Sequence, residues 1–221
     1  MIFRTPGLRP DVPELLSAQA KGSMITSEME AFFQVCPCHT IGVTGSDGKT
    51  TTTTIIASLL KAAGYHTFVG GNIGRPLLAD ADGMEPDDWA VLELSSFQLM
   101  TMDLSPEIAV VTNLAPNHLD VHTSMEEYTA AKKNIFLHQG TADRAVFNYD
   151  NEITREFLEE TPGRAVSFSL RQELSQGVYG KDGAIWVAND QGRRSVLPLD
   201  GILLPGEHNV ENYMAAIAAV D

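Results

Sequence analysis

The sequence predicts an α/β fold in which a mostly parallel, doubly wound sheet carries a phosphate-binding loop, with a small antiparallel β element near the C-terminus. Three observations support this fold class. Apolar runs of strand length alternate with segments of helical periodicity, the pattern of successive βαβ units. A glycine-rich turn, "GSDGKT", separates one strand from the helix after it. Near the C-terminus, short strands are separated by turn sequences typical of hairpins.

The first half of the sheet is predicted by four apolar runs. The first, "HTIGVTG", is followed by a segment from Thr50 to Ala63 whose apolar residues recur at helical spacing, and Gly64 is a helix stop signal. Three further runs are continuous enough to be strands buried on both faces. They are "YHTFVGG" at 65–71, "WAVLELS" at 89–95 and "EIAVVTN" at 107–113.

The second half repeats the alternation. A helix is expected from Ser124 to His138, because Ser124 and Glu127 match the S-x-x-E capping box. It is followed by the strand "RAVFNYD", a helix over about 150–160 and the strand "RAVSFSL". The resulting βαβ series predicts a mostly parallel sheet.

The pattern changes from residue 177 onward. Residues 177–199 contain short strands separated by the turn signals "KDG" and "NDQG", which predict antiparallel hairpins. An alanine-rich helix is expected from Asn209 to Asp221. Before Thr40 we expect a loop, "TPGLRPDVP", and a helix from Pro13 to Ala20, which is too little for a complete domain. Both ends therefore suggest that the chain is cut from a longer protein.

Composition limits the possible functions. The formal net charge of −14 disfavours nucleic-acid and anionic-membrane partners, which prefer clustered Lys and Arg. No signal peptide or membrane-spanning apolar run is present in the sequence, so we expect a cytoplasmic protein. Cys36 and Cys38 are too few for a disulfide framework, and ordinary reduced thiols are favoured over a metal site.

The stretch "GVTGSDGKT" has the parts of a phosphate-binding loop. Backbone N–H groups and the helix N-terminus would cradle phosphate, Lys49 would reach the terminal phosphates, and Thr50 could bind Mg²⁺. The spacing departs from G-x-x-x-x-G-K-[ST], because Val43 stands where the first glycine is expected. The alternative is a plain glycine turn. It is disfavoured because a lysine at a helix start opposes the helix dipole.

Two further positions lie at carboxyl ends of predicted strands, where open α/β sheets bind ligands. Glu93 ends an apolar strand in "VLELSSFQLM" and is a candidate metal ligand, the alternative being a solvent-facing glutamate. His118, in "TNLAPNHLDVH", could bind metal or orient a substrate. Asp120 and His122 are close competitors, and a surface histidine remains the alternative.

Several motifs together resemble the Mur ligase family. They are "VTGSDGKTTTT", "VGGNIGRPL", "LELSSFQL", "TNLAPNHLDVH", "YTAAKKNIF" and "GEHNVENYMAA", in the order found in that family. The resemblance covers nearly the whole chain and includes the modified loop spacing. "LELSSFQL" is the most discriminating motif and is most similar to the members that add D-glutamate.

The resemblance implies an ATP-dependent ligase of peptidoglycan precursor synthesis. ATP, with Mg²⁺, would phosphorylate the carboxylate of UDP-N-acetylmuramoyl-L-alanine, and the amine of D-glutamate would attack the acyl phosphate. The phosphate of ATP and the substrate carboxylate are both anions, so their approach requires positive charge. Metal ions and Lys49 would supply that charge. The resemblance also implies that residues 1–38 are the tail and linker of a UDP-substrate domain, that 39–221 form the central ATP-binding domain, and that a C-terminal ligase domain is absent. A monomer is expected.

The resemblance also assigns site residues. Lys49, Glu93, His118 and Lys132 would be catalytic. Those assigned to ATP are Gly45, Ser46, Asp47, Gly48, Lys49, Thr50, Thr51, Asn209 and Asn212. Those assigned to the UDP-sugar substrate are Thr5, Pro6, Gly7, Asn72, Ser95, Gln98 and His118. Thr50, Glu93, His118 and carbamylated Lys132 would serve the metal.

Carbamylation of Lys132, which the resemblance implies, requires a neutral amine and hence a lowered lysine pKa. The alternative is a solvated helix lysine like adjacent Lys133.

Two other functions stay open. A sister Mur ligase or a folylpolyglutamate synthase would share the ATP chemistry, although "LELSSFQL" argues against both. A nucleotide-binding module without ligase activity is the alternative outside the enzymes. Because domain closure orients the incoming amine, we expect the isolated chain to bind nucleotide weakly and to form no amide bond.

Overall fold

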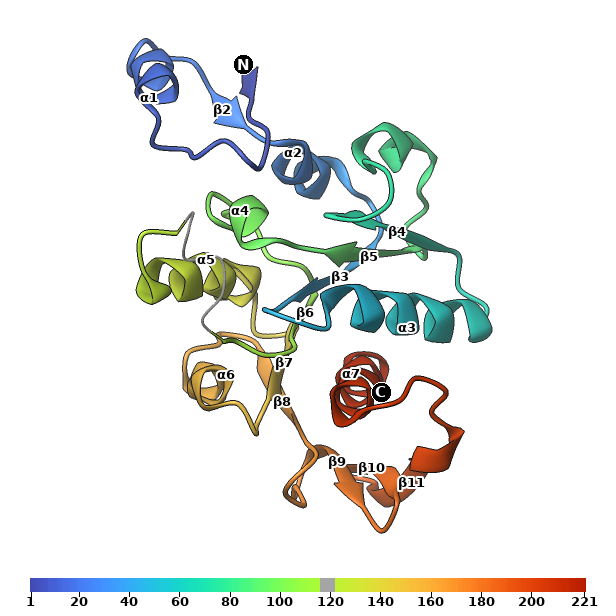
Figure 1. The fold of residues 1–221 in the computed structure, drawn as a ribbon. Coiled ribbons are helices and arrows are strands. Elements are labelled where there is room, and N and C mark those ends of the chain that lie inside the picture. Colours follow the sequence, from blue (N-terminus) through green and yellow to red (C-terminus); the bar gives the residue numbers. More distant parts are fainter. Residues whose placement is uncertain (116–121) are drawn as a thin grey trace.

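The computed structural model describes residues 1–115 and 122–221 and confirms the predicted fold class. A nine-stranded sheet runs through the molecule in the order β11-β10-β9-β8-β7-β6-β3-β5-β4, with helices on both faces (Figure 1). The strands are β3 (His39–Thr44), β4 (Thr67–Gly71), β5 (Trp89–Glu93), β6 (Ile108–Val111), β7 (Arg144–Asn148), β8 (Arg164–Ser169), β9 (Gly177–Lys181), β10 (Ala184–Asn189) and β11 (Gly192–Pro198).

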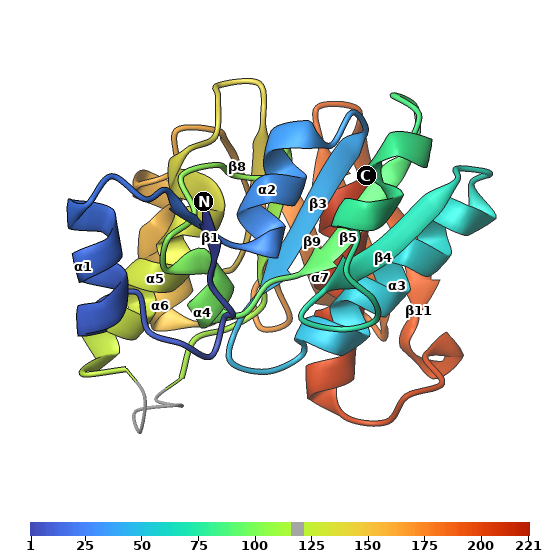
Figure 2. The same cartoon turned by 90° about the horizontal axis from the view of Figure 1, so that it is seen from above.

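The strands from β3 to β8 pair in parallel, as the apolar runs predict. Two layers of helices explain why these runs are continuous rather than alternating, since each central strand is covered on both faces. One layer consists of α3 (Lys49–Ala62) and α7 (Glu207–Val220), and the other contains α4 (Ser96–Leu99), α5 (Met125–Leu137) and α6 (Glu152–Glu156) (Figures 1 and 2). Two buried apolar clusters, one on each face, form the core.

The C-terminal antiparallel strands continue the main sheet. β9 pairs in parallel with β8, and β10 pairs antiparallel with both β9 and β11. The predicted "KDG" turn is a tight one in which Asp182 and Gly183 have φ of +48° and +72°. Positive φ at both central residues matches the twist of a two-residue hairpin. The hairpins are confirmed, but they extend the sheet instead of forming a separate element.

The cap predicted for α5 is only half formed. The Ser124 hydroxyl accepts a hydrogen bond from the Glu127 amide at 3.2 Å. The Glu127 carboxylate accepts from the Thr123 amide at 2.6 Å, one residue before the position that a reciprocal capping box requires. The same carboxylate also accepts from the guanidinium of Arg9 at 2.8 Å, 118 positions away in the chain.

The helix predicted over 150–160 is shorter and begins later. α6 covers Glu152–Glu156 and tightens into the 3₁₀ turn η2 (Phe157–Glu159). Asn151 caps α6 by accepting from the Thr154 amide at 3.1 Å. Asp150 remains outside the helix because its carboxylate accepts from the Ser169 hydroxyl and the Leu170 amide.

The segment before the main sheet contains the predicted α1 (Pro13–Ala20) and three elements that we did not predict. β1 (Ile2–Phe3) and β2 (Ile25–Thr26) form a two-stranded parallel sheet, and α2 (Glu28–Val35) follows with Ser27 as its cap. Two 3₁₀ turns elsewhere, η1 (Leu78–Gly83) and η3 (Leu199–Gly201), complete the described elements. Within 1–115 and 122–221, no helix is long and apolar enough to cross a membrane.

Candidate active site

The predicted phosphate loop joins β3 to α3. Gly45 and Gly48 have φ of +152° and +80°, which side chains rarely adopt. A Cβ at Gly45 would collide with the Thr112 hydroxyl, and one at Gly48 would collide with the Asn212 side chain. α3 starts at Lys49, so the amides of its first turn have no partner within the helix and can bind an anion.

The loop is held by residues that follow β6. The Thr112 hydroxyl donates to the Asp47 carbonyl at 2.6 Å, and the Asn113 side-chain carbonyl accepts from the Asp47 amide at 3.0 Å. The Ser46 hydroxyl donates to the Ala115 carbonyl at 3.1 Å and accepts from the Ala115 amide at 2.9 Å. Sequence analysis missed Thr112 and Asn113 as supports, although both lie at the carboxyl end of a predicted strand.

Lys49 lies over this loop. Its ammonium donates to the carbonyls of Gly45 and Ser46, both at 2.9 Å. Burial lowers its pKa, and the negative charges of Glu93 and Asp47 oppose that shift. The structure therefore places the ammonium of Lys49 at the loop, and its contact with phosphate stays a prediction.

Glu93 lies at the carboxyl end of β5, between Val43 of β3 and Gly71 of β4. It is only 2% exposed, so the solvent-facing alternative is wrong. Its carboxylate accepts from the Thr50 hydroxyl at 2.6 Å and from the Asn72 side-chain amide at 2.9 Å. Three motifs that are distant in the sequence thus meet at one carboxylate.

Thr50 and Glu93 fit a magnesium ion, because hydroxyl and carboxylate oxygens are the ligands that Mg²⁺ prefers. Across 1–115 and 122–221, no three His, Cys, Asp or Glu side chains come together as a metal cluster. Mg²⁺ commonly completes its coordination with phosphate oxygens and water.

The side chain of Lys132 extends from α5 to the junction between β3 and the glycine-rich loop. Its ammonium donates to the Thr44 hydroxyl at 3.1 Å and the Gly45 carbonyl at 2.9 Å, and it lies 4.8 Å from the centre of the Tyr128 ring. Only 1% of the residue is exposed. Burial, reinforced by the charge of Lys49, lowers its pKa to about 7. The solvated-lysine alternative is wrong, and the neutral amine is accessible near neutral pH.

The two asparagines assigned to ATP lie at the start of α7. Asn212 accepts from the Thr52 hydroxyl at 3.3 Å and donates to the Asn209 side-chain carbonyl at 3.3 Å. Asn209 donates to the Pro205 carbonyl at 2.7 Å. These bonds fix the start of α7 beside α3. Thr50 and Thr51 line a groove of about 540 Å³ between the two helices.

Ser95 and Gln98 form a capping box at the start of α4. The Ser95 hydroxyl accepts from the Gln98 amide at 3.3 Å, and the Gln98 side-chain carbonyl accepts from the Ser95 amide at 3.0 Å. Sequence analysis assigned both to substrate and missed this S-x-x-Q signal. Their first role in the structure is to start a helix directly after Glu93.

Thr5, Pro6 and Gly7 lie in the loop after β1, which is held by Arg4. The guanidinium of Arg4 donates to the Leu8 carbonyl at 2.6 Å and, on the side of α4, to the Thr101 hydroxyl at 3.0 Å. Arg4 is only 4% exposed, and burial lowers its pKa. Sequence analysis missed it, since a single arginine before a loop carries no recognisable signal.

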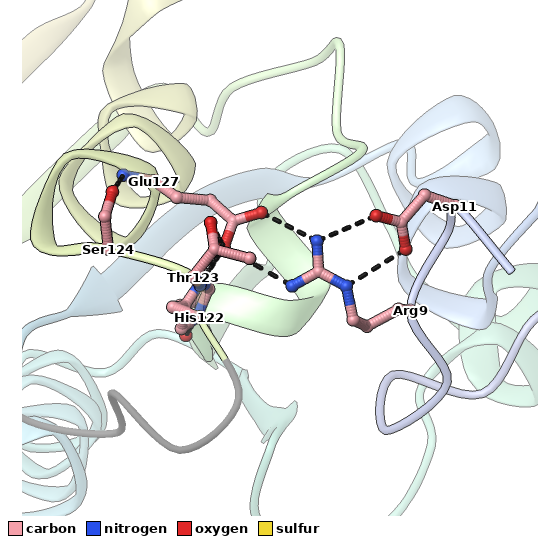
Figure 3. A network of polar contacts seen from close by, with 7 residues as sticks. Arg9, Asp11, His122, Thr123, Ser124 and Glu127 are labelled. Carbon is pink, nitrogen blue, oxygen red and sulfur yellow. Dashed lines mark hydrogen bonds and ion pairs between the residues drawn. The ribbon is translucent and has the colours of Figure 1, made fainter.

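A second arginine joins the same segment to α5. Arg9 binds Asp11 at 2.9 Å and Glu127 at 2.8 Å, as Figure 3 shows. The Arg9 contact, with the bonds from Thr123, lowers the pKa of Glu127 to about 2. The loop 5–8 therefore lies between two arginines, of which Arg4 contacts α4 and Arg9 contacts α5.

His122 is a buried link rather than an exposed ligand. One ring nitrogen of His122 lies 2.8 Å from the Ser96 hydroxyl, and the other lies 3.6 Å from the Glu127 carboxylate (Figure 3). The ring also stacks on Phe97. Burial lowers its pKa. Predicted His118, and its competitor Asp120, lie outside the described residues.

Known proteins resemble this chain over its whole length. The chain is 53% identical to the UDP-N-acetylmuramoylalanine--D-glutamate ligase of Acetivibrio thermocellus over 220 residues, which is 100% of this chain and 47% of that protein. It is 52% identical to the same-named ligase of Ruminiclostridium cellulolyticum, over 99% of this chain and 47% of that protein. The chain thus spans about half the length of the curated relatives it matches.

Solved structures show the same fold. A UDP-N-acetylmuramoyl-L-alanyl-D-glutamate--2,6-diaminopimelate ligase matches with a TM-score of 0.66 and 25% identity, over 89% of this chain and 48% of the other. A D-alanyl-D-alanyl-adding ligase from Acinetobacter baumannii matches with a TM-score of 0.64 and 22% identity, over 86% of this chain and 44% of the other. The family profile described as the Mur ligase middle domain matches residues 43–220. With its phosphate loop, Glu93 and Lys132 in one place, this chain belongs to the Mur ligase family.

Proposed function

We propose that this chain supplies the ATP-binding centre of a ligase that adds D-glutamate to UDP-N-acetylmuramoyl-L-alanine. The observation that carries the proposal is the convergence of Lys49, Thr50, Glu93 and Lys132 at the carboxyl ends of β3 and β5. An acyl phosphate forms between two anions, so a site for this reaction must gather positive charge and metal-binding oxygens. The identity to two ligases of that name supports the choice of amino acid.

In this proposal the first turn of α3 and Lys49 hold the phosphates of ATP, while Thr50 and Glu93 hold Mg²⁺. When bound, the ion would neutralise charge that builds up between the phosphate and the substrate carboxylate. The 2.6 Å contact between Thr50 and Glu93 supports their common role, because one ion could contact both oxygens. His118 is proposed to serve the same centre on family resemblance alone.

Lys132 is proposed to act as its carbamate. Carbamate formation needs an unprotonated amine and carbon dioxide, and it turns a cation into an anion that can bind a second Mg²⁺. The burial of Lys132 and its lowered pKa of about 7 support this role, since much of the amine is then neutral at physiological pH. The hydroxyl of Thr44 lies 3.1 Å from the amine and itself donates to the Leu94 carbonyl at 2.7 Å, which fixes its position.

The UDP-sugar substrate is proposed to lie between the loop at Thr5, Pro6 and Gly7 and the residues Asn72, Ser95 and Gln98. Arg4 supports this arrangement because it connects the loop to α4, which Ser95 and Gln98 begin. Asn72 already contacts Glu93, so a substrate bound there would meet the proposed metal centre.

We further propose that Asn209 and Asn212 contact the adenine of ATP. They lie at the start of α7, next to α3, and Gly48 approaches Asn212 closely. Residues 1–38 would form the end of a UDP-substrate domain, and residues 39–221 the central ATP-binding domain. The family match over 43–220 supports this division.

A chimera tests the function directly. The matching segment of the Acetivibrio thermocellus ligase, which covers 47% of that protein, is replaced by this chain. The chimera should release ADP and phosphate only when UDP-N-acetylmuramoyl-L-alanine and D-glutamate are both present, and mass spectrometry should detect the amide product. The same chimera with Lys49→Ala is the matched control.

Other results would select other functions. ADP release with a different amino acid or with a folate substrate would identify a sister ligase or a folylpolyglutamate synthase. ATP binding by a folded chimera without ADP release would favour a nucleotide-binding module. Either result would contradict the proposal.

A further inference from the structure

Cys36 and Cys38 lie at the connection between α2 and β3, which leads directly into the phosphate loop. Their sulfur atoms are 3.4 Å apart, and both are free thiols. The residue between them, Pro37, is exposed, and Cys36 is half-buried, whereas Cys38 is only 6% exposed. One thiol of the pair therefore lies near solvent and the other lies behind it.

The surroundings favour reaction at Cys36. The contact between the two sulfur atoms lowers the pKa of Cys36 to about 7, while the same contact and burial raise the pKa of Cys38. The negative charge of Glu107, whose carboxylate lies 2.7 Å from a ring nitrogen of His39, raises the pKa of Cys36 and so opposes this shift. A thiol with a pKa near neutrality is an efficient nucleophile in thiol–disulfide exchange.

Cys38 is fixed in place by the core. Its thiol contacts the Met84 sulfur at 3.8 Å, and it belongs to the apolar cluster that includes Phe32 of α2. A disulfide needs its sulfur atoms at about 2.05 Å. Closing the gap therefore requires a movement of about 1.4 Å, which falls mainly on Cys36 at the surface.

We propose that Cys36 and Cys38 form a reversible redox pair that closes to an intramolecular disulfide when the protein meets a small-molecule disulfide such as oxidised glutathione. The Cys36 thiolate attacks one glutathione sulfur, the glutathione S–S bond breaks, and one glutathione thiolate leaves. Cys38 then loses its proton and attacks the Cys36 sulfur, which releases the second glutathione. Two cysteine thiols are oxidised, and one glutathione disulfide is reduced to two thiols.

The disulfide closes a very small ring, because only Pro37 separates the two cysteines. Strained disulfides are reduced more easily than structural ones, which suits a labile and regulatory bond. While closed, the bond protects Cys36 from irreversible oxidation to sulfinic acid. The proposal concerns this thiol pair alone and does not depend on the ligase function.

The test incubates the 221-residue chain in glutathione buffers from fully reduced to fully oxidised, then quenches with acid, alkylates and measures intact mass. In the oxidised buffer the chain should take up no alkyl groups and should be lighter by about 2 Da, since two hydrogen atoms leave. Dithiothreitol should restore two alkylated cysteines. The measurement uses neither ATP nor substrate. A negative result would therefore contradict the disulfide proposal without bearing on the proposed ligase function.

Two variants assign the order of reaction. Cys38→Ser should stop with one glutathionyl group on Cys36. Cys36→Ser should react at least about tenfold more slowly, because the remaining thiol is buried. Two alkylatable thiols in oxidised glutathione, two glutathionyl groups on the parent chain, or a disulfide between two chains would each overturn the proposal.

Discussion

The hydroxyl of Thr50 donates a 2.6 Å hydrogen bond to the carboxylate of Glu93, which joins the first turn of α3 to the end of β5. These residues are 43 positions apart in the chain. Their contact joins the helix that follows the glycine-rich loop to a buried carboxylate, and we propose that this pair holds Mg²⁺.

Replacing Glu93 by Gln should weaken Mg²⁺-dependent nucleotide binding about tenfold, because the charge is lost while the size is kept. Binding without Mg²⁺ should change much less. Isothermal titration with ATP, with and without Mg²⁺, measures both. Glu14→Gln, at an exposed position on α1, is the control. Equal losses in the two conditions would point to a packing role for Glu93.

Replacing Lys49 by Ala should weaken ATP binding at fixed Mg²⁺ by about tenfold or more, because the loop loses its cation for the terminal phosphates. Fluorescence titration with a labelled nucleotide gives the Kd. Lys61→Ala, on an exposed position of the same helix, should bind like the parent. An unchanged affinity in Lys49→Ala would contradict the phosphate-loop assignment.

The burial of Lys132 predicts a pH dependence of stability. Its pKa is about 7 in the folded chain and 10.5 in the unfolded chain, so the unfolded state holds more protons between these values. The free energy of unfolding should therefore rise with pH across that window, and the penalty of the buried charge is fully present below about pH 7.

Lys132→Met removes this dependence. Urea unfolding at several pH values from about 6.5 to 9.5 should show the parent gaining stability relative to the variant as pH rises. The control is Lys133→Met, at the position next to Lys132, which removes an ion pair with Glu160. A difference between parent and Lys132→Met that stays constant over this range would show that Lys132 is not held neutral.

Replacing Arg4 by Met should loosen the loop 5–8, because the carbonyls of Pro6 and Leu8 lose their buried donor. The loss is expected to cost about 1–3 kcal/mol of stability. Hydrogen exchange should quicken in the peptides over 5–8 and 97–101, and the phosphate loop should stay protected. Arg75→Met, whose side chain is 73% exposed, is the matched control. Unchanged exchange over 5–8 would contradict this supporting role.

The sequence by itself determined the fold class, the alternation of strands and helices, and the location of the glycine-rich loop between β3 and α3. These features depend on local patterns. Apolar runs identify strands buried on both faces, the glycine-rich turn between a strand and a helix identifies the loop, and Glu93 follows from its place at a strand end. Helix limits at 150–160 were less well predicted, because the carboxylate of Asp150 binds β8 instead of starting α6.

The tertiary structure alone decided the contacts between distant segments. Arg4 donates to the Phe97 carbonyl of α4, and Arg9 binds Glu127, 118 positions away. Neither pairing has a local signal in the sequence. Burial likewise decided the lowered pKa of Lys132, whose ammonium is enclosed beside β3. The adjacent Lys133 instead binds Glu160 at the surface. Local periodicity fixes which residues form an element, but desolvation and long-range pairing exist only once the elements have packed.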